Sequence, residues 1–180
     1  MKIFVALSIL LGISLGGCAT SSRSIPLQDA IWQDFKMKIP ASWVIESEPG
    51  NFAAKNPDGS ESMDIMAVEL PNDLLSRNPT PEEIIKYHIA YLSQPGLAPP
   101  EVFVVEPIQT IRLPCGEPAS LTVEGLGEPD YSIDLAVASK NSLYTINFYQ
   151  WGNPEKNMNF YRGLIKTARI TGFPGSRCTK

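Results

Sequence analysis

The alternation of hydrophobic and polar residues predicts strands over most of the chain. Residues 35–39 read Phe-Lys-Met-Lys-Ile, and this period of two is typical of a half-buried strand. Comparable patterns, rich in β-branched and aromatic residues, predict strands at 43–45, 52–55, 62–70, 101–106, 109–113, 120–126, 132–139 and 143–150. The segment 143–150 carries aromatic residues on both faces, which indicates a central strand that is covered on both sides.

Turn and capping residues divide these strands and predict two helices. Residues 56–59 (Asn-Pro-Asp-Gly) are a strong turn signal, so a hairpin is expected there. Residues 80–83 (Thr-Pro-Glu-Glu) start a helix, because threonine can cap, proline suits the first helical position and the second glutamate closes a capping box. This helix stops at Pro95-Gly96, and a second one runs from Pro154 to about Ala168. The order of hairpin, helix, strand meander and helix predicts an α+β domain on an antiparallel sheet.

The amino-terminal segment has the pattern of an export signal. Lys2 precedes an apolar run over residues 3–15, which is shorter than the about 20 residues of a membrane-spanning helix. Such a run fits the hydrophobic region of a secretory signal. The motif Leu15-Gly16-Gly17-Cys18 resembles the lipobox of bacterial lipoproteins. The resemblance implies that residues 1–17 are removed and that Cys18 carries lipid, which anchors the protein in a membrane.

The lipoprotein resemblance also predicts a location and a domain layout. The residue after the cysteine is Ala19 and not Asp. In the lipoprotein family this implies sorting to the outer membrane, facing the periplasm. Residues 18–28 are then the lipidated cysteine and a tether, and residues 29–180 form a single domain. An ordinary signal peptide followed by an incidental cysteine is the alternative interpretation.

The two other cysteines are expected to form a structural disulfide. Once Cys18 carries lipid, Cys115 and Cys178 remain, and both enter an oxidising compartment. A bridge between them ties the carboxyl-terminal tail to the body of the domain. The alternative is a reactive thiol, but the sequence contains no Cys-x-x-Cys motif and no histidine close to either cysteine.

Charge is distributed unevenly along the chain, whose formal net charge is −4. Residues 24–139 hold 18 acidic and 6 basic side chains, whereas residues 140–180 hold one acidic and seven basic ones. This balance argues against nucleic acid as the main partner, because a phosphate backbone requires clustered Lys and Arg. Arg162, Lys166 and Arg169 share one face of the last predicted helix. They are interpreted as a solvated face or as a docking strip for an acidic partner or lipid phosphates.

No pattern of catalytic or cofactor-binding residues is found. The sequence has one histidine, which excludes zinc sites built from two or three histidines. It also lacks a nucleophile elbow, a dinucleotide or phosphate glycine loop and a metalloprotease motif. His88 has helical spacing with Ile84, Ile85 and Leu92, so the edge of the core is favoured over a general base. The chain is therefore predicted to be no enzyme and to hold no cofactor.

Acidic residues gather near two predicted turns. They are Asp58, Glu61 and Asp64 near the first turn, and Glu124, Glu128, Asp130 and Asp134 near the second. Neither group has the spacing of a calcium-binding loop, and alternation along strands places near neighbours on opposite faces. We interpret them as solvated loop acids.

A second resemblance concerns the fold. Residues 35–43 (Phe-Lys-Met-Lys-Ile-Pro-Ala-Ser-Trp) resemble the F-x-x-x-(I/Y)-P-x-x-W opening of PsbP-like domains, and the predicted elements follow that family's order over residues 31–172. The resemblance implies an α/β/α sandwich with a mainly antiparallel central sheet, one helix after the first hairpin and one at the carboxyl terminus. Members include PsbP subunits of photosystem II, a Ran-binding nuclear import factor and DcrB-type envelope lipoproteins, which share protein binding rather than catalysis.

These observations predict a non-enzymatic envelope lipoprotein that is anchored to the membrane and acts by contact with an envelope protein, in assembly or maintenance of a complex. A second hypothesis is a carrier or sensor of a small apolar or lipid-like ligand held between sheet and helix. Its candidate residues are the aromatic side chains Trp43, Tyr91, Tyr149 and Trp151. A third hypothesis, an envelope hydrolase, has the least support because no catalytic constellation is visible.

Overall fold

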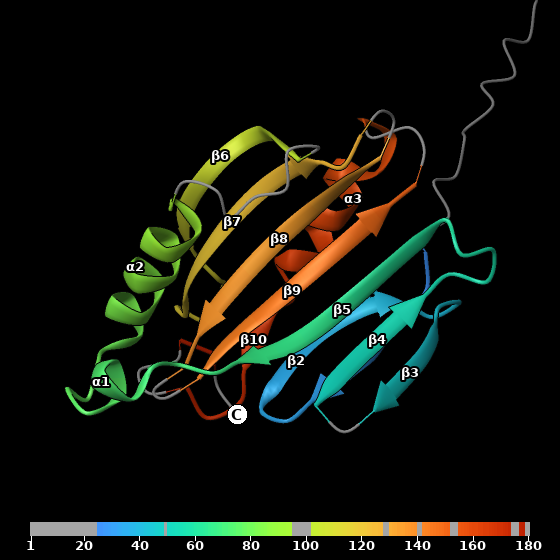
Figure 1. Cartoon of the computed structure of the whole chain (residues 1–180). Coiled ribbons are helices and arrows are strands. Elements are labelled where there is room, and N and C mark those ends of the chain that lie inside the picture. Colours follow the sequence, from blue (N-terminus) through green and yellow to red (C-terminus); the bar gives the residue numbers. More distant parts are fainter. Residues whose placement is uncertain are drawn as a thin grey trace, which may run out of the picture.

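The computed structural model describes residues 25–48, 50–94, 102–127, 130–139, 142–151, 155–173 and 177–178. The predicted signal segment 1–17, Cys18 and most of the predicted tether lie outside these residues. Within the described residues, seven strands form one antiparallel sheet in the order β3-β4-β5-β9-β8-β7-β6 (Figure 1). The strands are β3 (Val44–Glu48), β4 (Asn51–Lys55), β5 (Glu61–Val68), β6 (Phe103–Arg112), β7 (Pro118–Gly125), β8 (Tyr131–Ala138) and β9 (Leu143–Gln150).

One face of this sheet, called the back face, carries the main core. It is covered by helix α3 (Glu155–Ile165), which lies behind β8 and β9 in Figure 1, and by a small sheet. The small sheet has the order β1-β2-β10, with β1 (Leu27–Trp32), β2 (Phe35–Pro40) and β10 (Arg169–Ile170). Its buried side chains and those of α3 pack on the apolar residues of the large sheet. These core residues include Phe35, Met37, Ile65, Ile133, Phe148, Tyr161 and Leu164.

The opposite, front face is covered at one end by helix α2 (Pro81–Leu92), which follows the short helix α1 (Asn72–Leu75). Helix α2 packs over β7 and β8, where Ile84 and Ile85 form a second apolar cluster with residues that include Ala136 and Leu143. The predicted capping box is confirmed. Glu83 N donates to Thr80 Oγ1 at 3.3 Å, and the Glu83 carboxylate accepts from Thr80 N at 2.7 Å.

The layers α2, sheet, and α3 with the small sheet confirm the predicted α+β fold. The hairpin at residues 56–59 is also confirmed, since Asp58 Oδ1 accepts from Ser60 N at 2.9 Å and Gly59 has a φ of +75°. Two strands were predicted on either side of Pro107, but β6 is continuous through it. β6 is an edge strand with two register shifts between Val104 and Gln109, and edges and bulges tolerate proline.

Strand β9 is central as predicted, because it lies between β5 and β8. The prediction that it is covered on both sides is wrong. Tyr144, Ile146 and Phe148 are buried on the back face, whereas Thr145 and Tyr149 on the front face are half-buried. Polar side chains on the front of β9 and its neighbours therefore remain in reach of a ligand.

The predicted disulfide is confirmed. Cys115 and Cys178 are bonded, with their Cα atoms 5.0 Å apart and a separation of 63 positions in sequence. Arg177 N donates to Cys115 O at 2.8 Å, and the fully buried Glu117 carboxylate accepts from Ile170 N at 2.9 Å. Both contacts fasten the carboxyl-terminal segment to the loop before β7. Across the described ranges, the helices are all too short or too polar to span a bilayer.

Candidate binding site

Polar side chains on the front face form cross-strand rows. In one row Thr122 of β7 lies opposite Asp134 of β8, Asp134 opposite Asn147 of β9, and Asn147 opposite Asp64 of β5. The adjacent rows are Glu124, Ser132 and Tyr149 on one side and Ser120, Ala136 and Thr145 on the other. Because side chains alternate between the faces of a strand, the front-face residues of these rows are polar apart from Ala136, while the residues between them build the core.

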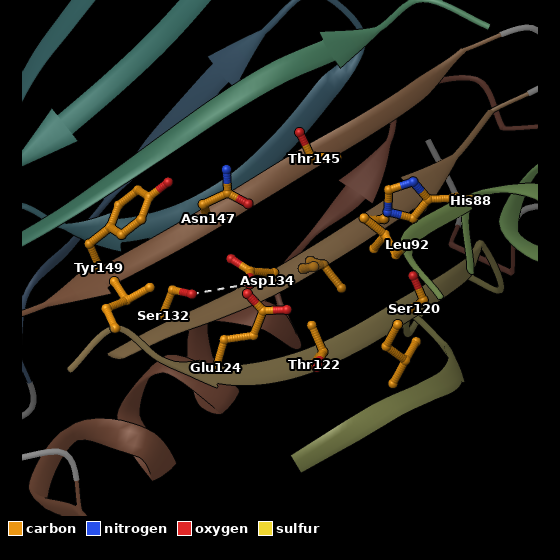
Figure 2. A pocket seen from close by; sticks show the side chains of 14 residues that line it. His88, Leu92, Ser120, Thr122, Glu124, Ser132, Asp134, Thr145, Asn147 and Tyr149 are labelled. Carbon is orange, nitrogen blue, oxygen red and sulfur yellow. Dashed lines mark hydrogen bonds between the residues drawn. The ribbon is translucent and has the colours of Figure 1, made fainter. Parts of the chain in front are cut away.

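These rows line a hollow of about 320 Å³. Its floor is the front of β7, β8 and β9, and His88 and Leu92 of α2 stand at one end, as Figure 2 shows. Ile108 of β6 and Leu126 complete the lining. The hollow lies where α2 stops covering the sheet, so the two-layer packing at one end of the front face gives way to a concave surface that combines apolar side chains with a few polar groups.

The hydroxyl groups of the floor are deeply buried. Ser120 and Thr122 are each 4% exposed and Ser132 is 2% exposed. Thr122 Oγ1 donates to the Glu106 carbonyl at 2.9 Å, and Ser132 Oγ donates to Asp134 Oδ2 at 3.1 Å. No hydrogen bond joins the Ser120 hydroxyl to another described residue, and its oxygen is not among the fully buried atoms without a partner, so it faces the open space of the hollow.

Acidic groups dominate the electrostatics of the hollow. Burial, together with the nearby Glu124 charge, raises the pKa of Asp134 to about 7, and the hydrogen bond from Ser132 offsets part of this shift. Burial also raises the pKa of Glu124 and that of the neighbouring Asp64. The lining residues that the structure describes include no Lys or Arg, so these carboxyls have no cation beside them.

His88 lies at the end of the hollow and is half-buried, in keeping with the predicted edge of the core. Burial lowers the pKa of its imidazole, which favours the neutral form. It makes no hydrogen bond within the described part of the chain. In that part no group of three or more His, Cys, Asp and Glu side chains is placed to hold a metal ion.

The four aromatic residues considered for an apolar ligand are not brought together. Trp43 is buried in the back-face core, and Tyr91 is 46% exposed on α2. Tyr149 and Trp151 do meet, since their rings stack with centroids 6.4 Å apart and an interplanar angle of 7°. Tyr149 lines the hollow and Trp151 is 49% exposed, so this aromatic pair forms part of its rim.

The predicted basic strip divides into two parts. The guanidinium of Arg162 on α3 binds the Glu106 carboxylate of β6. Lys166 and Arg169 are exposed, but α3 ends at Ile165 and Arg169 belongs to β10. The three side chains therefore do not lie on one helix face, and Arg162 is engaged within the domain.

The two acidic groups noted in the sequence contribute to one surface. Asp64 comes from the first group, and Glu124 and Asp134 come from the second, yet all three face the front of the sheet. This surface is not visible in the local sequence pattern, because β5 and β9 are neighbours in the sheet although they are far apart in the chain. For Glu124 and Asp134, the alternation of side chains along β7 and β8 could have indicated that both lie on the same face of the sheet.

No protein-family model and no curated protein sequence matches the chain. Among solved structures, it is similar to the solution structure of the cyanobacterial PsbP protein (CyanoP) from Synechocystis sp. PCC 6803, with a TM-score of 0.52 and 12% identity. That match covers 87% of this chain and 98% of the other. It is also similar to the Ran-binding protein Mog1p of Saccharomyces cerevisiae, with a TM-score of 0.50, 10% identity and coverage of 82% and 96%. At these identities the matches confirm the PsbP-like and Mog1-like fold alone.

Proposed function

We propose that the chain is a lipid-anchored envelope protein that binds a protein partner through the front face of its sheet and catalyses no reaction. The observation that carries this proposal is the unequal covering of the two faces. Helix α3 and the small sheet cover the back face, whereas α2 covers one end of the front and leaves the polar hollow beside it. A concave surface with convergent polar groups is the usual form of a binding site.

The anchoring part of the proposal rests on the sequence. Leu15-Gly16-Gly17-Cys18 resembles a lipobox, and two or more acyl chains hold a protein stably in a membrane. Strand β1 begins at Leu27, so eight residues separate it from Cys18. At about 3.5 Å per residue these can span at most about 28 Å, which keeps the domain close to the bilayer. A partner is then expected in the same membrane or at its surface, in the outer membrane facing the periplasm.

Protein binding agrees with the fold. One of the two similar structures belongs to a protein described as Ran-binding, so this arrangement of sheet and helices is used for protein binding elsewhere. Fold alone does not carry function, and the proposal depends on the front face rather than on this likeness.

A carrier of a small ligand is the second candidate, because about 320 Å³ lies within the range of small-molecule sites. The lining mixes apolar side chains with carboxyl, hydroxyl and amide groups. Each polar group that a purely apolar molecule leaves unsatisfied costs about 1–3 kcal/mol, so the ligand of such a carrier is expected to carry polar groups as well.

Site-specific photo-crosslinking in the intact envelope tests the proposal. A photoreactive residue replaces Leu92 or Met66, both 40% exposed on the front side, or Ile31, which is 58% exposed on the small sheet. We expect one discrete protein adduct from each front position and none from Ile31. Adducts that are absent at both front positions, or equal at all three, would overturn the proposal. Loss of the chain from the membrane fraction in Cys18→Ser tests the anchor separately.

A further inference from the structure

The small sheet β1-β2-β10 has an exposed outer face, on the side that is turned away from the large sheet. Side chains alternate along its strands, so every second residue of β2 points into the core while Lys36 and Lys38 point outward. The register places Ile31 of β1 and Arg169 of β10 on either side of Lys36. Ile31 and Arg169 are both exposed, so this row of side chains is open to a partner.

This outer face is basic, although the domain as a whole is acidic. The three strands of the small sheet carry the cations Lys36, Lys38 and Arg169 and one acid, Asp29. The Asp29 carboxylate binds both lysines, at 3.0 and 2.8 Å, so one negative group is shared by two positive groups. The outer face therefore keeps a net positive charge.

The residues that flank the small sheet keep this charge in place. Lys166 is exposed, and it lies beside β2 because the next residue, Thr167, accepts a hydrogen bond through Oγ1 from Lys38 N at 2.8 Å. Asp34, the acidic residue of the turn between β1 and β2, accepts a hydrogen bond from the buried Tyr144 hydroxyl. The Asp34 carboxylate is thus directed toward the core and away from the outer face. A basic surface of this kind is complementary to anionic groups.

Exposed aliphatic side chains accompany the cations. Ile25, Leu27 and Ile31 are all exposed, and they lie on the stretch of chain that leads from Cys18 into the domain. The eight residues between Cys18 and Leu27 span at most about 28 Å, so β1 is held close to any membrane that takes up the lipid. Exposed apolar residues among basic ones are typical of surfaces that bind the interface of an anionic bilayer.

We propose that the outer face of the small sheet lies on the membrane that holds the lipid anchor, with Lys36, Lys38 and Arg169 at the phosphates of acidic phospholipids and Ile31 at the level of the headgroups. This inference rests on the anchoring part of the proposed function and names the surface that faces the bilayer. The hollow lies on the other face of the large sheet, so membrane contact on the small sheet leaves the hollow open to a protein partner.

Photo-crosslinking to lipid tests the inference. The lipidated full chain carries a photoreactive residue at Ile31, or at Val104 as a matched control. Val104 lies on edge strand β6 opposite Glu124 of the front face, and the two side chains are equally accessible, at 58% and 60% exposure. Each protein is reconstituted in vesicles of phosphatidylcholine and phosphatidylglycerol, and lipid adducts are measured by mass spectrometry. We expect a yield at Ile31 at least about five-fold above that at Val104, and equal yields would overturn the inference.

The Ile31 reporter also tests the need for charge. The combined changes Lys36→Gln, Lys38→Gln and Arg169→Gln are expected to lower the lipid-adduct yield at least about five-fold, since each cation near an acidic bilayer adds attraction. The control variant removes the same charge at three exposed cations of other elements, namely Lys55→Gln, Arg77→Gln and Lys86→Gln. Vesicles of phosphatidylcholine alone, which need no variant, are expected to lower the wild-type yield by a similar factor. A yield that is unchanged in the small-sheet variant, or in neutral vesicles, would contradict the assignment.

The outcomes separate this inference from the proposed function. If Ile31 gives no lipid adduct while the chain still floats with the vesicles, the membrane-facing surface is wrong and the anchor stands. If the chain does not float with the vesicles, the proposed anchor fails and this inference fails with it. A discrete protein adduct at Ile31 in the intact envelope would assign the outer face to a protein and would overturn its contact with lipid. In detergent, a micelle around the same acyl chains covers this face as the bilayer does, so purification leaves the exposure of Ile31 unchanged.

Discussion

The most specific energetic consequence of the hollow concerns Asp134. Its pKa of about 7 in the folded chain stands well above the ordinary value of 3.8, because burial and the Glu124 charge disfavour ionisation. A carboxyl whose pKa is raised on folding contributes stability below its unfolded pKa and loses that contribution as the pH rises through its folded pKa. Asp134 therefore lowers the free energy of unfolding progressively between about pH 4 and pH 7, where the unfolded chain ionises before the folded one, and by a constant amount above pH 7.

The replacement Asp134→Asn removes this effect without changing the size of the side chain. A gap of about three pKa units corresponds to about 4 kcal/mol at 1.36 kcal/mol per unit. Asp134 is half-buried, so solvent screening reduces the expected gain to about 2 kcal/mol. We expect the free energy of unfolding of the variant to exceed that of the wild type by this amount at pH 8.

Urea denaturation from pH 4 to pH 8 measures the difference. The gain should be small at pH 4, grow up to pH 7 and level off above it. His88 has a lowered pKa and acts in the opposite direction, but it is present in both proteins and its effect cancels to first order. Asp73→Asn, which makes the same change at an exposed acid on α1, is measured beside it as the control. A gain that does not depend on pH, or a loss of stability at pH 8, would refute the reasoning about Asp134.

Three further predictions test the fold and the anchor. The double change Cys115→Ala and Cys178→Ala should lower the free energy of unfolding by about 4 kcal/mol, since the bridge closes a loop over 63 positions. A loss below about 1 kcal/mol, measured by urea denaturation, would contradict this. Thr80→Ala removes one acceptor of the capping box and should cost about 1 kcal/mol, measured as a shift in Tm; an unchanged Tm counts against the cap. Cys18→Ser should release the chain from washed membranes, and full retention would argue against the lipid anchor.

Local patterns predicted most of the large sheet, strand β2 of the small sheet and helix α2. The period of two at residues 35–39 and the turn at residues 56–59 each depend on neighbours in sequence, and both are found in the structure. The capping box that starts at Thr80 has the same local origin. Such features are readable because the residues that form the contact lie within a few positions of one another.

Elements stabilised from a distance were missed. Strand β10 has two residues, Arg169 and Ile170. It forms because these residues pair with β2, which lies near the other end of the sequence. Strand β1 starts at Leu27, inside the segment that was interpreted as a tether, and its burial comes from the core beneath it. Neither has enough periodic residues to be recognised without its partner strand.

The candidate site was missed for a related reason. Asp64 and Asp134 were each noted in the sequence, but their common row depends on β9 lying between β5 and β8. Register between strands that are distant in the chain is set by packing on the back face, which the local pattern does not contain. The sequence therefore predicted the strands, but the interpretation as solvated loop acids is wrong for Asp64, Glu124 and Asp134, which lie on strands and are half-buried on one surface.

Hydroxyl-radical footprinting of the full chain in intact envelope membranes, and again after purification in detergent, tests the central claim most directly. The account predicts that Leu92, Met66 and Tyr149, on the front face, are less oxidised in the membranes than after purification, while Ile31 on the small sheet is oxidised equally in both. Protection of Ile31 alone, or equal oxidation of the front-face residues in both states, would contradict the front face as the binding surface.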